Sequence, residues 1–145
     1  MPLHIACGDG QIYEIEIVGS YTPAAAAGNP ILEPNNSTPV TNSFNFQYGV
    51  QTQATVVGDH AEAIANNGFL LAAGQASLLS AKATIFTSTA TKRTSTHSSS
   101  YNTAPNYASG WVDSTWNDTT TVWSSIGTIT MPNAWTGTIV VRRVA

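Results

Sequence analysis

Side chains that could perform catalysis or bind a metal are few in this sequence and lie far apart. The histidines are His4, His60 and His97, and Cys7 is the single cysteine. Nucleophilic catalysis needs a nucleophile, a base and an orienting group, and a zinc site needs several Cys or His ligands at short spacing. None of these four residues has such a partner in its own segment. Cys7 ends an apolar run, in which a thiol is typically buried.

A pair of acidic residues is the next candidate for chemistry. Asp113 and Asp118 flank Trp116, and two carboxylates beside an aromatic ring are the groups that a glycosidase uses. Acids five residues apart in a polar stretch are more often simply solvated. The sequence also has no phosphate-binding loop and no dinucleotide-binding motif. We therefore predict that the protein is not an enzyme and has no catalytic residue, metal site or cofactor.

Aromatic residues are concentrated near the C-terminus. Four tryptophans fall within 25 residues and two tyrosines precede them: Trp111, Trp116, Trp123, Trp135, Tyr101 and Tyr107. Such residues can stack on sugars, anchor a subunit interface or fill a core. We predict that Trp123 and Trp135 belong mostly to the core, because they adjoin predicted strands. Trp111 and Trp116 lie in a stretch rich in Ser, Asp and Asn and are predicted to contact a partner.

The composition indicates a β-rich protein with an unusually uncharged surface. Charged residues make up 9% of the chain, against about 25% in typical proteins, whereas 45 of the 145 residues are Ser, Thr or Asn. These side chains suit strands and turns better than helices. A surface so poor in charge is either covered by other subunits or kept soluble by Thr and Asn alone. The net charge of −3 argues against nucleic acid, and no apolar run is long enough to span a membrane.

Alternating apolar and polar residues define the expected elements of one domain over residues 1–145. Tyr13, Ile15 and Ile17 share one face of a strand over residues 11–18, which follows the turn at Asp9-Gly10. The remaining expected elements are a first hairpin arm at 3–7, strands at 44–57, 69–73 and 77–89, one short helix at about 60–66, a loop around an edge segment at 90–110, and a closing hairpin over 123–129 and 135–139. The predicted fold is mainly β, an antiparallel β-sandwich or jelly roll.

Residues 19–43 break this pattern. Pro23, Pro30, Pro34 and Pro39 exclude a continuous helix or a central strand. Long segments of this kind are usually functional or disordered. The segment is expected to be either an extended arm that contacts a neighbouring subunit or a long loop on its own domain.

The chain combines an Asn-, Thr- and Ser-rich β pattern with a single cysteine, a Pro-rich segment and an aromatic C-terminal hairpin. In these features it resembles small phage virion accessory proteins, namely capsid decoration (cement) proteins and fibre-tip domains. The resemblance implies a sandwich or jelly-roll subunit, often a homotrimer, that binds the major capsid protein or another virion protein and stabilises the shell. The residues after Met1 form no signal peptide, so synthesis in the host cytoplasm and location in the virion are expected.

Two functional hypotheses follow. The first is a capsid decoration subunit. Its candidate contacts are the aromatic residues and prolines Trp111, Trp116, Tyr101, Tyr107, Pro23, Pro30, Pro34 and Pro39. The alternative is a carbohydrate-binding module or a receptor-binding fibre tip, in which Trp111, Trp116, Asn117 and Asp118 contact the sugar.

Overall fold

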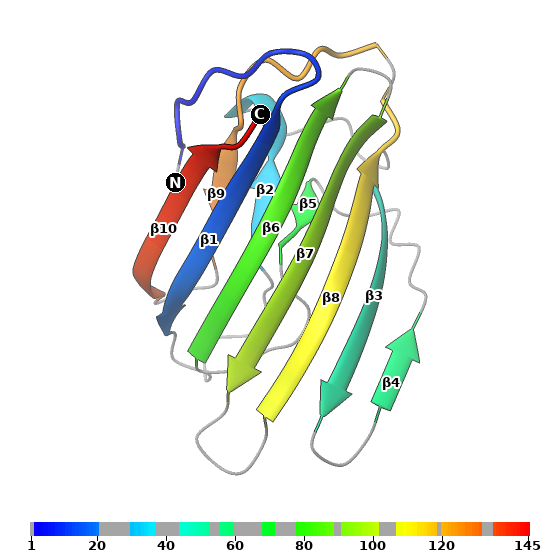
Figure 1. Cartoon of the computed structure of the whole chain (residues 1–145), viewed down its shortest axis with the longest axis vertical. Helices are drawn as coiled ribbons and strands as arrows, with labels where there is room; N and C mark the ends of the chain where they lie inside the picture. The colour runs from blue at the N-terminus through cyan, green and yellow to red at the C-terminus, as the bar shows by residue number, and fades with distance from the viewer. Residues whose placement is uncertain are drawn as a thin grey trace.

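The chain forms two antiparallel β-sheets that face each other (Figure 1). The computed structural model describes residues 2–20, 30–36, 44–52, 56–59, 68–71, 78–88, 91–101, 107–118, 120–131 and 135–145, and for some strand residues among them only the backbone. The prediction of a mainly β, antiparallel protein is confirmed, and the two facing sheets are compatible with the expected sandwich or jelly roll.

The large sheet has seven strands in the order β10-β1-β6-β7-β8-β3-β4. Their bounds are β1 Ile12–Ser20, β3 Phe44–Thr52, β4 Val56–Asp59, β6 Leu78–Ser88, β7 Thr91–Tyr101, β8 Tyr107–Trp116 and β10 Thr136–Arg143. The small sheet lies behind the large one in Figure 1 and has the order β5-β2-β9. Its elements are β2 Ile31–Glu33, β5 Phe69–Leu70 and β9 Thr128–Thr130, with a 3-10 turn, η1, at Pro34–Asn36.

Alternation along the strands determines which side of the large sheet is buried. In β1, Tyr13, Ile15 and Ile17 are buried, as the sequence predicted, while Glu14 and Glu16 lie on the opposite side. In β6 the alternate residues from Leu79 to Ile85 are likewise buried. Side chains that pair across neighbouring strands lie on the same face, so β1 and β6 share an apolar inner face, and Glu14, Glu16 and Lys82 lie on the outer face.

The core lies between the inner face of the large sheet and the small sheet. Leu32 of β2 and Ile129 of β9 are completely buried there. Aromatic rings join the two layers: Phe44 of β3 packs edge-on against Phe69 of β5 at a centroid distance of 5.0 Å, and Phe69 stacks on Trp123 at 4.9 Å. One hydrophobic core therefore includes residues of both sheets.

Asn35 fixes the segment that carries Trp123 into this core. Its Nδ2 donates to the carbonyl of Val122 at 2.8 Å, and its Oδ1 accepts the backbone N–H groups of Ser124 at 2.8 Å and Ser125 at 3.1 Å. Asn35 has a φ of 63°, a left-handed conformation that Asn adopts more readily than most residues. The residue type therefore serves both the backbone conformation and the hydrogen bonds.

The first predicted hairpin is only partly correct. The turn at Asp9-Gly10 is present, with a φ of 72° at Gly10, and it leads into β1. The segment before the turn does not pair with β1. The N–H of Leu3 instead donates to the carbonyl of Gly127, and the N–H of Cys7 to that of Ser124. The reason is that β6 and β10 already pair with the two sides of β1.

Two predictions for the second half of the chain are wrong. Residues 91–101, expected to lie in a loop, form the long strand β7 between β6 and β8. The closing hairpin does not form either, because β9 pairs with β2 in the small sheet and β10 pairs with β1 in the large one. The segment between β9 and β10 therefore connects the two layers instead of turning back within one sheet.

The remaining expectations concern the middle of the chain. The strands predicted at 69–73 and 77–89 correspond to β5 and β6, and the strand predicted at 44–57 is divided into β3 and β4. Segment 19–43 is not a continuous arm, because it contains β2, the central strand of the small sheet. The helix predicted at 60–66 lies outside the described residues.

Candidate functional site

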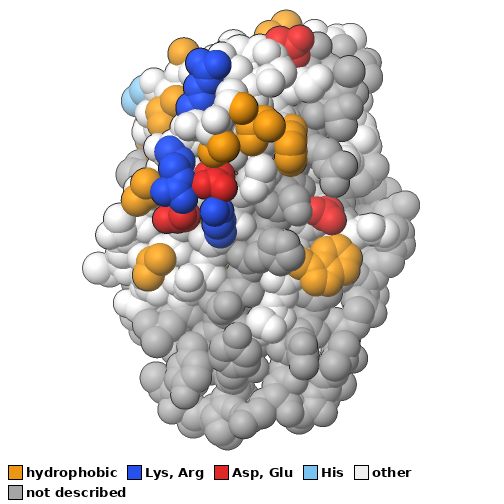
Figure 2. Space-filling model, in the orientation of Figure 1, with side chains coloured by type: hydrophobic (Ala, Val, Ile, Leu, Met, Phe, Trp, Pro, Cys, Tyr) orange, Lys and Arg blue, Asp and Glu red, His pale blue; other side chains and the backbone are white. Residues whose placement is uncertain are grey.

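The outer face of the large sheet extends over the sheet with the larger number of strands. We define it by the outward side chains Glu14, Glu16, Val18, Lys82, Trp111, Asp113, Val140 and Arg142. The small sheet packs on the opposite side (Figure 1). Figure 2 shows this face from the front, with acidic and basic side chains grouped together and hydrophobic side chains around them.

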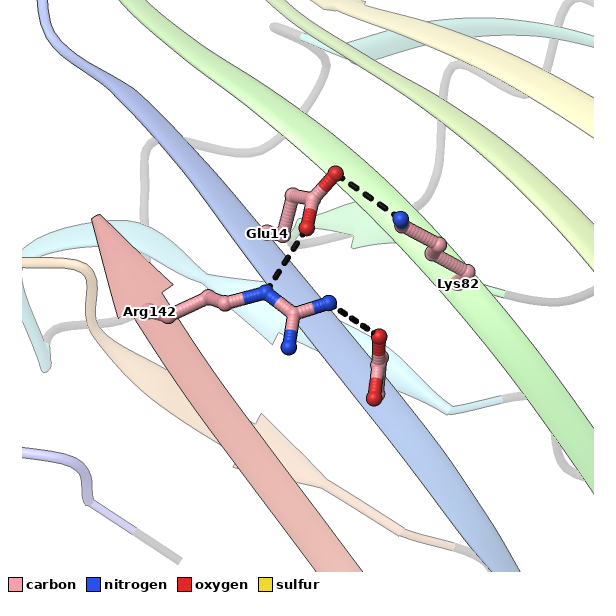
Figure 3. Close-up of polar contacts among 4 residues, drawn as sticks. Glu14, Lys82 and Arg142 are labelled. Carbon is pink, nitrogen blue, oxygen red and sulfur yellow. Dashed lines mark hydrogen bonds and ion pairs between the residues drawn. The ribbon is translucent and has the colours of Figure 1, made fainter. Parts of the chain in front are cut away.

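Four charged residues of the outer face, Glu14, Glu16, Lys82 and Arg142, form an ion-paired cluster (Figure 3). One carboxylate oxygen of Glu14 lies 2.9 Å from Nζ of Lys82, and the other accepts a hydrogen bond from Nε of Arg142 at 2.8 Å. Arg142 also donates to the carboxylate of Glu16. Register brings these side chains together: Glu14 lies directly opposite Arg142 on β10, whereas Lys82 lies opposite Glu16 on β6 and reaches Glu14 diagonally.

This cluster predicts how Glu14 titrates. Hydrogen bonds from Lys82 and then Arg142 lower the pKa of the Glu14 carboxyl below its ordinary value. A carboxyl whose pKa is lower in the folded than in the unfolded protein stabilises the fold at pH values above its unfolded pKa. That contribution is lost as the pH falls through the lowered, folded-state value. We expect Lys82→Met to raise the Glu14 pKa, measured from its carboxyl carbon shift in an NMR titration.

Lys82→Arg is the matched control for this titration, because it keeps the positive charge. We expect the Glu14 pKa in that variant to stay below the ordinary range of glutamate, near 4.3. An unchanged Glu14 pKa in Lys82→Met would contradict the assignment of the shift to this ion pair.

Trp111 lies further across the same face, on β8. Its side chain is 43% exposed, which is unusual for so large an apolar group. The residues that pair with it are Gly49 on β3, which has no side chain to cover the indole, and His97 on β7. Asp113, two residues further along the same strand, pairs with Gln47. Trp111 is therefore exposed, as contact with a partner would require, and the contact itself remains a prediction.

Trp116 was expected to join Trp111 at the partner surface, and this expectation is wrong for the folded chain. Its side chain is only 6% exposed. It stacks on Phe44 at a centroid distance of 5.8 Å and meets Trp123 edge-on at 6.1 Å. Residues five apart on one strand point to opposite faces, so Trp116 faces the core when Trp111 faces outward. The core location predicted for Trp123 is confirmed, and Trp135 is partly buried against the same core.

The other two residues of the sugar hypothesis follow β8 directly. Asn117 is exposed. Asp118 organises the next turn: its Oδ1 accepts the N–H groups of Thr120 at 2.7 Å and Thr121 at 2.9 Å. Hydrogen bonds, first of all from the Thr121 hydroxyl, hold the pKa of Asp118 well below its usual range. Asp118 thus shapes the segment between Trp116 and Trp123.

Two of the four candidate prolines are described, and neither lies on the surface. Pro30 and Pro34 are buried next to β2, so the expectation that they meet a partner is wrong. Their place in the core follows from β2, which lies between the two other strands of the small sheet. Pro23 and Pro39 lie outside the described residues.

The two candidate tyrosines lie at the ends of neighbouring strands: Tyr101 ends β7 and Tyr107 begins β8. Tyr101 and Tyr107 pair with each other where β7 joins β8, and only their backbone is described. The ion cluster around Arg142 and the exposed Val18 and Val140 were not predicted from the sequence. Alternation already placed the glutamates of β1 outward, but no local signal indicates that β10 and β6 are the strands beside them.

Among the described residues, those with catalytic potential form no cluster that could hold a metal. His4 is exposed, His97 belongs to β7, and His60 lies outside the described residues. Burial raises the pKa of Cys7 to about 11, and its thiol donates to the carbonyl of Trp123, so little reactive thiolate forms at neutral pH. Across the part of the chain that the structure describes, no three His, Cys, Asp or Glu side chains form a metal-binding group.

A helix long and apolar enough to cross a membrane is likewise absent from the described residues. Compared with known proteins, the chain matches no family model, no curated protein sequence and no solved structure. The function is therefore argued from the outer face itself.

Proposed function

We propose that the protein is a non-catalytic virion subunit, a capsid decoration protein that binds an assembled shell through the outer face of its large sheet. The observation that carries this proposal is the character of that face. It combines an exposed tryptophan with acidic and basic side chains that are already paired within the same chain.

Both features favour a protein partner. Tryptophan is enriched among the residues that dominate the energy of protein interfaces. Unpaired charges are costly to cover, because each must be stripped of water. Glu14, Lys82 and Arg142 keep their partners when another protein covers them, which reduces this cost. A subunit that binds only the assembled shell stabilises that state by mass action.

The alternative is a glycan-binding module or fibre tip centred on Trp111. An exposed indole can stack on a sugar ring, and Asp113 on the same strand can accept hydrogen bonds from hydroxyls. In this alternative Trp116 cannot contact the sugar, because it is buried. Asp118 contributes only by organising the turn that follows β8. The virion hypothesis makes fuller use of the outer face and is preferred.

Co-sedimentation with intact particles of the virus that carries the gene tests the proposal. We expect the wild-type protein to sediment with the shell and Trp111→Ala to bind at least about tenfold more weakly. Val122→Ala is the control, because Val122 is also exposed but belongs to the segment bound by Asn35, outside the outer face. Its binding should equal that of the wild type.

Failure of the wild-type protein to bind particles would refute the decoration proposal. Binding to immobilised glycans that Trp111→Ala abolishes would then support the alternative. Deletion of residues 19–43 is unsuitable as a test of an arm, because it removes β2 from the small sheet.

A further inference from the structure

The strand β10 forms an edge of the large sheet that lacks the usual protection against pairing. Among the described residues it pairs on one side only, with β1. Natural edge strands are commonly short, bulged, or interrupted by proline or charge. The other edges follow this rule: β4 has four residues, β9 three and β5 two. β10 has eight residues in continuous register with β1, and its charges lie only at its end.

The centre of β10 is apolar on both faces. Ile139 and Val141 lie on the inner side, opposite Ile17 and Ile15, and are only partly buried against the core. Val140 lies on the outer side and is 44% exposed. Side chains with this β-branched shape favour strand pairing. The hydrophobic core thus extends to Ile139 and Val141 at the edge of the sheet, where these side chains remain partly exposed.

From this geometry we propose that β10 pairs antiparallel with β10 of a second copy of the chain, about a two-fold axis that passes through Val140. Residues directly opposite in an antiparallel pair lie on the same face. An axis at Val140 therefore places Ile139 opposite the partner's Val141 on the inner side. It places Val140 opposite its own copy on the outer side. The small sheets of both copies then lie on the same side of one continuous sheet.

Charge is compatible with this register and excludes one centred on Arg142. With the axis at Val140, Arg142 faces the partner's Thr138 and Arg143 faces the partner's Gly137, so no like charges meet. Moving the axis by two residues to Arg142 would place the two Arg142 side chains opposite each other, which is unfavourable. Arg142 is also neutralised within its own chain by Glu14 and Glu16. The proposal does not depend on the proposed virion function.

The experiment measures the mass of the full chain by sedimentation over a range of concentrations. We expect the wild type to form a dimer of twice 15.2 kDa. Val140→Lys would place two positive charges opposite each other across the axis and raise the dimer dissociation constant at least about tenfold. In the monomer the new lysine faces Glu16 across the strand pair, so the fold is retained. Circular dichroism of the variant checks that its β-sheet content equals that of the wild type.

Val18→Lys is the matched control. Val18 is also an exposed valine of the outer face, but it lies on β1, which is paired on both sides. We expect its dimer to be as stable as that of the wild type.

A covalent test fixes the register. In a Cys7→Ser background, Val140→Cys places two thiols opposite each other on strands whose Cα atoms are about 4.5–5.5 Å apart, within the range of a disulfide. Mild oxidation should cross-link this variant, with loss of two electrons and two protons to the added oxidant, and leave Val18→Cys uncross-linked. A monomer at all concentrations, a trimer, or a dimer insensitive to Val140→Lys would each overturn the proposal.

Discussion

Gly127→Ala is expected to destabilise the protein more than any other single change considered, by about 4 kcal/mol or more. Gly127 has a φ of 114°, a conformation that side chains rarely adopt. It is also buried, and a Cβ atom there would overlap the carbonyl oxygen of Glu33 and lie 2.8 Å from Cα of Pro34. Both obstacles are backbone atoms of the segment after β2, so relief requires the small sheet to shift. Urea unfolding followed by circular dichroism measures the loss.

Gly10→Ala separates the two causes. Gly10 also has a positive φ, 72°, but a Cβ atom there would meet nothing within 4 Å. This variant has only the cost of a left-handed conformation, about 1–2 kcal/mol. Equal unfolding midpoints for the two variants would show that the overlap with Glu33 does not matter, contrary to the prediction.

Trp123→Ala is expected to have the second largest effect, a loss of about 3–5 kcal/mol. The side chain is 1% exposed and contacts Phe69 and Trp116 in the aromatic cluster that joins the layers. Its Nε1 donates to the carbonyl of Ser125 at 2.7 Å, which would lose this partner. Since small domains are stable by only about 5–15 kcal/mol, a large part of the total would be lost.

The comparison variant is Trp111→Ala, which removes the same side chain from the outer face. Because Trp111 is only partly buried, its removal should lower the free energy of unfolding less than that of Trp123 does, by about 1–2 kcal/mol. Thermal unfolding of both variants checks the contrast. A Trp123 variant as stable as the Trp111 variant would mean that the aromatic cluster does not hold the two sheets together.

The sequence predicted those strands whose own residues alternate between apolar and polar, and it missed a strand whose position depends on its neighbours. The inward face of β1 follows from alternation within nine residues, and it was predicted correctly. β7 has no apolar alternation, because its residues are almost all Ser, Thr or charged, and it was mistaken for a loop. Its place comes from backbone pairing with β6 on one side and β8 on the other. No sequence pattern within β7 indicates that β6 and β8 are its neighbours.

The candidate site was likewise only partly predictable from the sequence. Trp111 and Trp116 were treated as equivalent because both lie in a polar stretch. Once that stretch is known to be a strand, their odd spacing assigns them to opposite faces, and one of them must enter the core. The ion cluster brings together residues that are 128 and 126 positions apart, which only the sheet order reveals.

The position of β1 between β6 and β10 also bears on folding kinetics. β1 is synthesised before β10, the strand with which it pairs. Until β10 is synthesised, one side of β1 has unsatisfied backbone groups, and closing so large a loop is entropically slow. The nascent chain therefore passes through a stage in which its sheet ends at β1. Chaperone dependence during expression should diminish once residues 136–143 have emerged.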